Sequence, residues 1–290
     1  MSDLHIAKYH GTGNDFVMIE DLGDEDPLEA TLVAALCDRH RGVGADGVIR
    51  VTASNEADFF MDYSNADGSV AEMCGNGIRC VGKLVYERGL TEKTELEVMT
   101  RGGRKHLALH LEGGTVRGVT VGMGRPAFER SAIPMTGPGQ ERFLGQPFDA
   151  AGRVWTASAV SMGNPHVVLF TDRDPATLDV RAFGPAIERD GRFPQGTNVE
   201  FVTRAGGELL TRVWERGVGE TMACGTGACA VMIAAHEAGL VGSRADVRFP
   251  GGVLDVEWED GGEVLLTGPA ERVFEATVDA AQLAAKGAGA

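Results

Sequence analysis

The sequence of 290 residues lacks the features of several protein classes. It has no run of 18 apolar residues and no apolar signal core after Met1, so neither a membrane-spanning helix nor a secretory leader is expected. It also has no excess of basic residues, because 27 lysines and arginines stand against 42 aspartates and glutamates, for a net charge of −15. This balance argues against nucleic acid or an anionic membrane surface as a partner. We therefore expect a soluble cytoplasmic protein.

The cysteines are few and show no pairing pattern. There are five, an odd number, and no two of them form a Cys-x-x-Cys pair. A disulfide framework, a zinc ribbon and a thioredoxin-type redox site are therefore not expected. Free thiols in a reducing compartment are the simpler interpretation, and we expect no bound metal.

What the sequence does contain is an internal duplication. The turn Cys74-Gly75-Asn76-Gly77 has a counterpart in Cys224-Gly225-Thr226-Gly227, 150 positions later. Matches that keep one offset indicate two similar halves, each with one Cys-Gly-x-Gly turn. The other matches at this offset are Gly13-Asn14 with Gly163-Asn164, and Glu87-Arg88-Gly89-Leu90 with Glu237-Ala238-Gly239-Leu240.

Each turn is predicted to begin a helix. Apolar residues recur at helical spacing after Cys74, an Ala-rich run follows Cys224, and the two runs stop at Gly89 and Gly239. A helix start presents backbone amides and positive potential, which lower the pKa of a thiol and bind an anion. We therefore expect two activated thiols, each beside a carboxylate-sized pocket. Two buried structural cysteines on repeated helices are the alternative.

Short β-type runs outnumber helices in both halves. We expect an α+β fold of two pseudo-symmetric domains, each a mostly antiparallel sheet wrapped round a central helix. The expected domains are residues 1–124 with Cys74 and residues 125–272 with Cys224, and the active site is expected in the cleft between them. The strand 273–290 is expected to return to the first domain. We further expect a helix from Pro27, one long helix per half, and a frayed tail from Gln282.

Two thiols on opposing domains suit the inversion of a carbon acid. A base removes the α-proton from one face, and an acid returns a proton to the other. The developing negative charge on the substrate carboxylate needs hydrogen-bond donors, and the first amides of both helices are placed for this. These donors are the N–H groups of Gly75, Asn76, Gly225 and Thr226. The thiol pair makes a pyridoxal cofactor unnecessary, so none is expected.

A set of motifs along nearly the whole chain resembles the diaminopimelate epimerase family. The resemblance implies a cofactor-independent isomerase that converts LL- to meso-diaminopimelate, for lysine and peptidoglycan-precursor synthesis. It also implies two similar domains that close on the substrate, and a cytoplasmic homodimer. The motifs are His10-Gly-Thr-Gly-Asn-Asp-Phe, Asn65-Ala-Asp-Gly-Ser, Met73-Cys-Gly-Asn-Gly-Ile-Arg-Cys, Gly163-Asn-Pro-His, Gly196-Thr-Asn-Val, Glu215-Arg-Gly and Ala223-Cys-Gly-Thr-Gly-Ala.

The resemblance also implies roles for individual residues. Cys74 and Cys224 would be the acid and base thiols, and His166 and Glu215 would tune them. Gly47 stands where some members carry a substrate-contacting glutamine, so no binding role is assigned to it. The residues that would contact the substrate are Asn14, Asn65, Gly75, Asn76, Asn164, Asn198, Glu215, Arg216, Gly225 and Thr226.

Simpler interpretations exist for several of these residues. Asn14 lies in a Gly-rich loop, where asparagine commonly forms a turn. His166 follows a proline and suits a strand end, and Arg216 suits an ordinary surface position. Cys80 and Cys229 lie beyond the first turn of each helix and are assigned to packing.

Two other functions remain open from the sequence. Another cofactor-independent racemase, acting on proline, hydroxyproline or histidine, would share the thiol pair. Arg216 and the asparagines favour a substrate with a second amino-acid end, and hence diaminopimelate. A non-catalytic thiol redox or metal-binding protein is the alternative from a different class.

Overall fold

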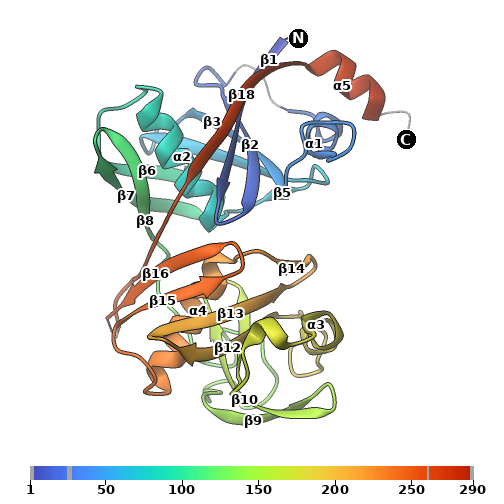
Figure 1. Ribbon diagram of the computed structural model, residues 1–290, viewed down its shortest axis with the longest axis vertical. Coiled ribbons are helices and arrows are strands. Elements are labelled where there is room, and N and C mark those ends of the chain that lie inside the picture. Colours follow the sequence, from blue (N-terminus) through green and yellow to red (C-terminus); the bar gives the residue numbers. More distant parts are fainter. Residues whose placement is uncertain (1–2, 25–27, 260, 288–290) are drawn as a thin grey trace. The chain divides into compact units, whose positions relative to one another are not determined.

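The structure is a computed structural model that describes residues 3–24, 28–259 and 261–287 (Figure 1). The chain divides into two compact units. Unit 1 contains the residues up to Val121 and those from Gly268 onward, and unit 2 is Gly122–Thr267. None of the helices within the described ranges is long and apolar enough to cross a membrane.

Over its described residues, unit 1 is a mostly antiparallel sheet with three helices. Its elements are β1 (Asp3–Gly11), β2 (Asn14–Glu20), α1 (Ala30–Cys37), β3 (Gly47–Ala53), β4 (Phe59–Asn65), β5 (Val70–Ala71), α2 (Gly75–Glu87), β6 (Glu95–Thr100), β7 (Gly103–Glu112), β8 (Thr115–Gly122), β18 (Glu271–Asp279) and α5 (Ala280–Gly287). The strands pair in the order β18, β1, β2, β3, β4, β6, β7, β8, and β5 pairs with β4. Among the strand pairs of the residues that the structure describes in this unit, only β2–β3 and β4–β6 are parallel. The last strand, β18, lies along the first, β1 (Figure 1).

Unit 2 repeats this plan. Its elements are β9 (Gln146–Ala150), β10 (Arg153–Ser161), β11 (Pro165–Phe170), the 3₁₀-helix η1 (Pro175–Thr177), α3 (Val180–Glu188), β12 (Asn198–Ala205), β13 (Glu208–Glu215), β14 (Gly219–Thr221), α4 (Gly225–Glu237), β15 (Arg244–Phe249), β16 (Gly252–Trp258) and β17 (Val264–Gly268). The strands pair in the order β9, β10, β11, β12, β13, β15, β16, β17, and β14 pairs with β13. The parallel pairs, β11–β12 and β13–β15, occupy the same places in this order as those of unit 1. The expected α+β fold with two similar halves is confirmed.

The two Cys-Gly helices are the buried centres of their units. In α2 every residue from Gly75 to Val85 is buried, and in α4 every residue of the same stretch except Thr226 is buried. Both helices end as predicted at glycines with positive φ, Gly89 at 70° and Gly239 at 69°. The next residue of each then donates back to the last turn, as in a Schellman cap.

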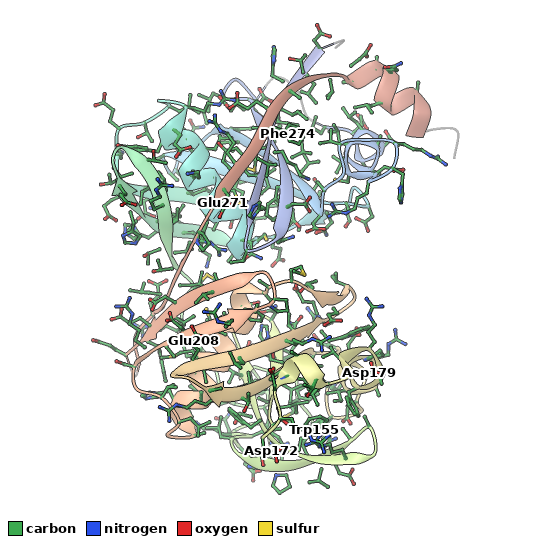
Figure 2. All side chains as sticks on the ribbon, viewed as in Figure 1. Trp155, Asp172, Asp179, Glu208, Glu271 and Phe274 are labelled. Atoms are coloured by element: carbon green, nitrogen blue, oxygen red, sulfur yellow. The ribbon has the colours of Figure 1, made fainter. Side chains whose placement is uncertain are left out.

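A second apolar layer covers the other side of each sheet. In unit 1, α1 and α5 pack over side chains of β1, β2 and β3, such as Ile6, Val17 and Val48. In unit 2, Phe183 of α3 packs over Trp155 of β10, which is labelled in Figure 2, and over Phe201 of β12. These layers lie outside the central helices and fix the strands that carry the site residues.

Three sequence-based expectations change here. The helix predicted from Pro27 begins at Ala30, and Pro27 itself lies outside the described residues. The tail predicted to fray from Gln282 forms α5, whose Leu283 and Ala284 pack against the layer under α1. In the second half one long helix was expected. The structure has α4 and also a shorter helix, α3, which corresponds to α1.

Candidate active site

Cys74 is the residue immediately before α2. Its backbone is extended, with φ −138° and ψ 117°, and its carbonyl accepts the first helical hydrogen bond, from the amide of Ile78. The amides of the first turn, including those of Gly75 and Asn76, have no acceptor within the helix. The half-buried thiol is thus held at the positive end of a helix, as the sequence predicted.

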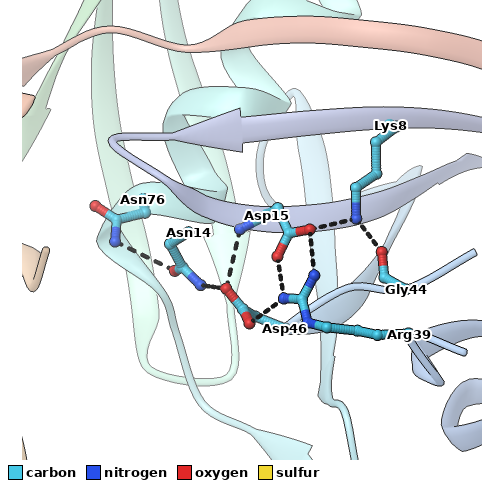
Figure 3. Close-up of polar contacts among 7 residues, drawn as sticks. All are labelled: Lys8, Asn14, Asp15, Arg39, Gly44, Asp46 and Asn76. Atoms are coloured by element: carbon cyan, nitrogen blue, oxygen red, sulfur yellow. Dashed lines mark hydrogen bonds and ion pairs between the residues drawn. The ribbon is translucent and has the colours of Figure 1, made fainter. Parts of the chain in front are cut away.

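Asn14 connects Cys74 to a charged network. Its Oδ1 lies 3.6 Å from the Cys74 Sγ. The same oxygen accepts from Asn76 Nδ2 at 3.2 Å (Figure 3). The Nδ2 of Asn14 donates to Asp46 Oδ2 at 2.7 Å. Asp46 in turn accepts from Arg39 at 2.7 Å. Asn14 was expected in the site from the sequence. Arg39 and Asp46, which approach it from the loop after α1, were not.

Two other positions singled out in the first half have plain structural surroundings. Asn65 ends β4, and its Nδ2 donates to Ser69 Oγ at 3.0 Å across a tight turn. A Cβ added at Gly47 would lie 2.6 Å from the Ser64 carbonyl oxygen and 2.6 Å from the Tyr63 ring. This chain therefore has no space for a glutamine at position 47.

Cys224 is the equivalent residue before α4, with φ −130° and ψ 122°. Its Sγ lies 3.5 Å from the Thr226 Oγ1. Burial, followed by the charges of Glu215 and Glu200, raises the pKa of the Cys224 thiol well above its ordinary value. The expected lowering of the pKa is therefore wrong for Cys224, because burial and two carboxylates outweigh the helix start.

A buried chain of side chains runs from Glu200 toward Cys224. Glu200 Oε1 lies 2.7 Å from His166 Nδ1, and both side chains are fully buried. His166 Nε2 lies 3.0 Å from Asn164 Oδ1, and Asn164 Nδ2 donates to Thr226 Oγ1 at 3.3 Å. Burial raises the pKa of Glu200, with its closeness to Glu215 adding to the effect. Glu200 was not expected in the site, although a single acidic residue within the apolar strand 199–202 indicates a buried partner.

The remaining residues predicted in the second half gather around Arg216. Asn198 uses its amide on backbone groups, donating to the Pro165 carbonyl at 2.9 Å and accepting from the Arg216 N–H at 2.9 Å. The exposed Arg216 guanidinium donates to the Gln195 carbonyl at 3.2 Å. Glu215 accepts from Thr221 Oγ1 at 2.5 Å. In this arrangement Asn198 fixes the backbone from which Arg216 projects.

The other cysteines are buried in packing positions. Burial raises the pKa of the Cys80 thiol to about 12 and that of Cys37 to about 11. Cys229 is fully buried on α4. These surroundings agree with the assignment of Cys80 and Cys229 to packing, because a reactive thiol must be reachable and able to ionise.

Known proteins match the chain along most of its length. A family model described as diaminopimelate epimerase matches residues 6–129 and 158–273. A protein named diaminopimelate epimerase from Pelotomaculum thermopropionicum is 47% identical over 274 residues, 93% of this chain and 97% of that protein. Another, from Desulforudis audaxviator, is 48% identical over 278 residues, 94% of this chain and 98% of that protein. The chain belongs to the diaminopimelate epimerase family.

Solved structures share the fold at low identity. A hydroxyproline epimerase from Agrobacterium vitis has a TM-score of 0.66 and 16% identity, and the match covers 96% of this chain and 94% of that one. A probable proline racemase from Agrobacterium radiobacter has a TM-score of 0.69 and 16% identity, with 94% and 92% covered. The predicted family and fold are confirmed, and so is the class of enzyme, an isomerase acting on amino acids.

Proposed function

We propose that this protein converts LL-diaminopimelate to meso-diaminopimelate, in lysine and peptidoglycan-precursor synthesis, by a two-base mechanism without a cofactor. The observation that supports this most is the pair of cysteines at equivalent helix starts, Cys74 before α2 and Cys224 before α4. The named relatives at 47% and 48% identity favour diaminopimelate over proline, because the proline-type racemases share only 16%.

The reaction needs one thiolate and one thiol. The thiolate takes the α-proton from one face of the substrate, which leaves a planar carbanion. The opposing thiol donates its proton to the other face, so the α-carbon inverts and the two sulfur atoms exchange protonation states. No proton is gained or lost in the complete step. In this proposal the two units close on the substrate, so that Cys74 and Cys224 face opposite sides of its α-carbon.

The substrate supplies part of the activation. Around Cys224 the fixed charges are negative, and they favour the thiol in the substrate-free enzyme. The α-ammonium group of a bound amino acid brings a positive charge, which favours the thiolate. The reacting carboxylate then binds the first-turn amides of Gly75, Asn76, Gly225 and Thr226, each worth roughly 3–4 kcal/mol as the charge on the carboxylate develops.

The distal end of the substrate needs its own partners. Arg216 is exposed and its backbone is fixed by Asn198, so its guanidinium is available to bind a carboxylate through two hydrogen bonds. The proposed contacts of Asn14, Asn65, Asn164, Asn198 and Glu215 complete this end. Of these, Asn14 and Asn164 lie beside the thiol turns.

We further propose that the enzyme is a homodimer that works in the cytoplasm. On β18, Glu271–Glu275 are all exposed, including Val273 at 57% and Phe274 at 43% (Figure 2). These two successive side chains project from opposite faces of the strand, and exposed apolar side chains on both faces favour a protein partner. All five cysteines are free thiols, which suits a reducing compartment.

The function is tested by incubating the purified protein in deuterated water with LL-diaminopimelate, proline and histidine, without added cofactor. We expect α-deuterium and epimerisation with diaminopimelate alone. Activity should survive both EDTA and hydroxylamine, which trap metals and pyridoxal carbonyls respectively. Turnover of proline instead would reject the substrate, and loss of activity with either reagent would reject the cofactor-free mechanism.

A further inference from the structure

The side chains around Asn14 form a chain of hydrogen bonds with a charged group at each end. Arg79 donates to Asn76 Oδ1 at 3.0 Å, and Asn76 Nδ2 donates to Asn14 Oδ1 at 3.2 Å. Asn14 Nδ2 then donates to Asp46 Oδ2 at 2.7 Å. We propose that Asp46, held by Arg39, is a positioning residue that fixes the Asn14 amide so that its carbonyl oxygen faces Cys74. This proposal rests on the catalytic role proposed above for Cys74.

The charged ends permit only one orientation of the two amides. A guanidinium only donates and a carboxylate only accepts, so Arg79 must meet the oxygen of Asn76 and Asp46 must meet the nitrogen of Asn14. With both ends set this way, every bond in the chain joins a donor to an acceptor. Turning the Asn14 amide over would bring its oxygen to a carboxylate oxygen at about the present 2.7 Å, where two acceptors repel.

Asp46 is itself held from several sides (Figure 3). Its Oδ2 accepts from the Asp15 N–H at 3.1 Å, and its Oδ1 accepts from Arg39 at 2.7 Å. Arg39 also binds both oxygens of Asp15, at 2.7 and 3.1 Å, and Lys8 lies 2.6 Å from Asp15. Although burial opposes it, the hydrogen bonds from Arg39 and Lys8 hold the pKa of Asp15 well below its usual range. Asp15 is therefore ionised at neutral pH, and Arg39 bridges its carboxylate to that of Asp46.

The charged groups that face this chain come from four parts of unit 1. They are Lys8 on β1, Asp15 on β2, Arg39 and Asp46 in the loop between α1 and β3, and Arg79 on α2. Their combined effect on Cys74 is to present an acceptor, the Asn14 oxygen, at 3.6 Å from the sulfur. An acceptor stabilises the thiol, which can donate, and disfavours the thiolate, which cannot. Asp46, acting through Asn14, therefore favours the thiol form of Cys74 over the thiolate.

The test is the rate at which iodoacetamide alkylates Cys74 near neutral pH, with the modified peptide identified by mass spectrometry. The thiolate is the reacting form, so the rate follows its population. In Asp46→Asn the Asn14 amide is no longer fixed, and we expect the rate to rise by about 3- to 10-fold. In the Asn14→Ala background the same Asp46→Asn change should have little effect, because the group through which Asp46 acts has been removed.

The matched control is Asp38→Asn. Asp38 starts the same loop and accepts from the amides of His40 and Arg41, at 2.7 and 2.8 Å, so the variant tests loop structure and charge without touching Asn14. Its alkylation rate should equal that of the parent. Equal rises for Asp46→Asn with and without Asn14 would show a charge effect alone and overturn the proposal. An unchanged rate in Asp46→Asn would do the same.

A second variant covers a failure of Asp46→Asn to fold, judged by circular dichroism. Arg39→Gln leaves Asp46 in place without its guanidinium partner, and we expect a smaller rise in the same direction, about 2- to 3-fold. No rise in a folded Arg39→Gln would then count against the proposal. Because alkylation needs no substrate, these results stand even if the protein does not epimerise diaminopimelate. If the protein does not epimerise diaminopimelate, the proposed function is wrong, but the alkylation rates still show whether Asp46 orients the Asn14 amide.

Discussion

The two units share a backbone plan and differ in the charges around their thiols. Helix α2 begins at Gly75 and α4 at Gly225, and the asparagines at positions 14 and 164 each lead to the neighbouring Cys-Gly turn. In unit 1 the polar chain from Asn14 leads out to the ion-paired network of Asp46, Arg39, Asp15 and Lys8, whose outer members Asp46 and Arg39 are exposed. In unit 2 the chain from Asn164 leads inward to the fully buried Glu200–His166 pair.

This difference suggests how a duplicated fold supports an asymmetric reaction. The repeated backbone supplies two similar helix starts, and thus two similar thiol positions and amide groups. The side chains at equivalent positions have diverged: by strand register, Phe16 and Ile49 of unit 1 correspond to His166 and Glu200 of unit 2. The two thiols therefore have different electrostatic surroundings, and we expect their pKa values to differ although both lie at the start of a helix.

The largest expected effect comes from removing one thiol at a time. Cys74→Ala and Cys224→Ala should each lose epimerisation by about 1,000-fold or more, because the carbanion has no proton donor on one face. Each variant should still exchange the α-hydrogen of one stereoisomer, and the two variants should differ in which one. The measurement is α-deuterium by NMR with LL and meso substrates. Near-normal epimerisation by either variant would end the two-base assignment.

The next effect belongs to unit 2 alone. Arg216→Lys should lower kcat/KM by about 10- to 100-fold, because an ammonium cannot form the two parallel hydrogen bonds of a guanidinium with a carboxylate. Arg204→Lys, at an exposed position on β12, is the matched control and should behave as the parent. Steady-state kinetics with LL-diaminopimelate distinguish them. Parent-like kcat/KM in Arg216→Lys means that this residue does not bind the distal carboxylate.

A smaller effect tests the buried pair of unit 2. Glu200→Leu leaves His166 Nδ1 without its partner, and kcat/KM should fall by about 10-fold as the Asn164 and Thr226 contacts loosen. Glu200→Gln keeps the shape and one hydrogen bond, so a loss of only about 3-fold is expected. The ¹⁵N signals of the His166 ring should move in both variants. If kcat/KM in Glu200→Leu equals that of the parent, the pair is structural.

The smallest effect concerns the charge next to Cys224. Glu215 adds to the burial that raises the Cys224 pKa, so Glu215→Gln should lower that pKa toward its ordinary value. More thiolate is then present near neutral pH, and Cys224 alkylation in the substrate-free enzyme should speed up by about 3- to 10-fold. Glu237→Gln, at the exposed end of α4, serves as the control and should leave the rate unchanged. A slower rate in Glu215→Gln contradicts the sign.

The sequence predicted well what depends on local chemistry. The starts of α2 and α4, their glycine ends and the repeat of the plan could all be read from Cys-Gly turns and one constant offset. Helix α3 was missed because it contains Gly184 and Pro185, which usually interrupt helices. Gly184 is needed there because the Trp214 ring lies where its Cβ would be, at 2.5 Å.

What could not be predicted depends on groups brought together from distant elements. Burial, Glu215 and Glu200 raise the pKa of Cys224. The prediction of a lowered pKa considered only the position of Cys224 at the start of a helix. The partnership of Asp46 with Asn14 joins the loop after α1 to the first residue of β2, and charged residues in loops are usually solvated. For Gly47, the departure from the family pattern was visible in the sequence, but the Tyr63 ring that explains it was not.

The return of β18 to β1 has a consequence for biosynthesis. In unit 2 the outer partner of β10 is β9, which comes just before it in the chain. In unit 1 the outer partner of β1 is β18, and contacts such as His5 with Thr277 join residues 272 positions apart. When the ribosome has synthesised the chain through Thr267, all of unit 2 is present, but β18, which pairs with β1, has not yet been made. Unit 2 is thus free to fold during synthesis, whereas a chain stopped before Glu271 leaves the first strand of unit 1 with one edge open.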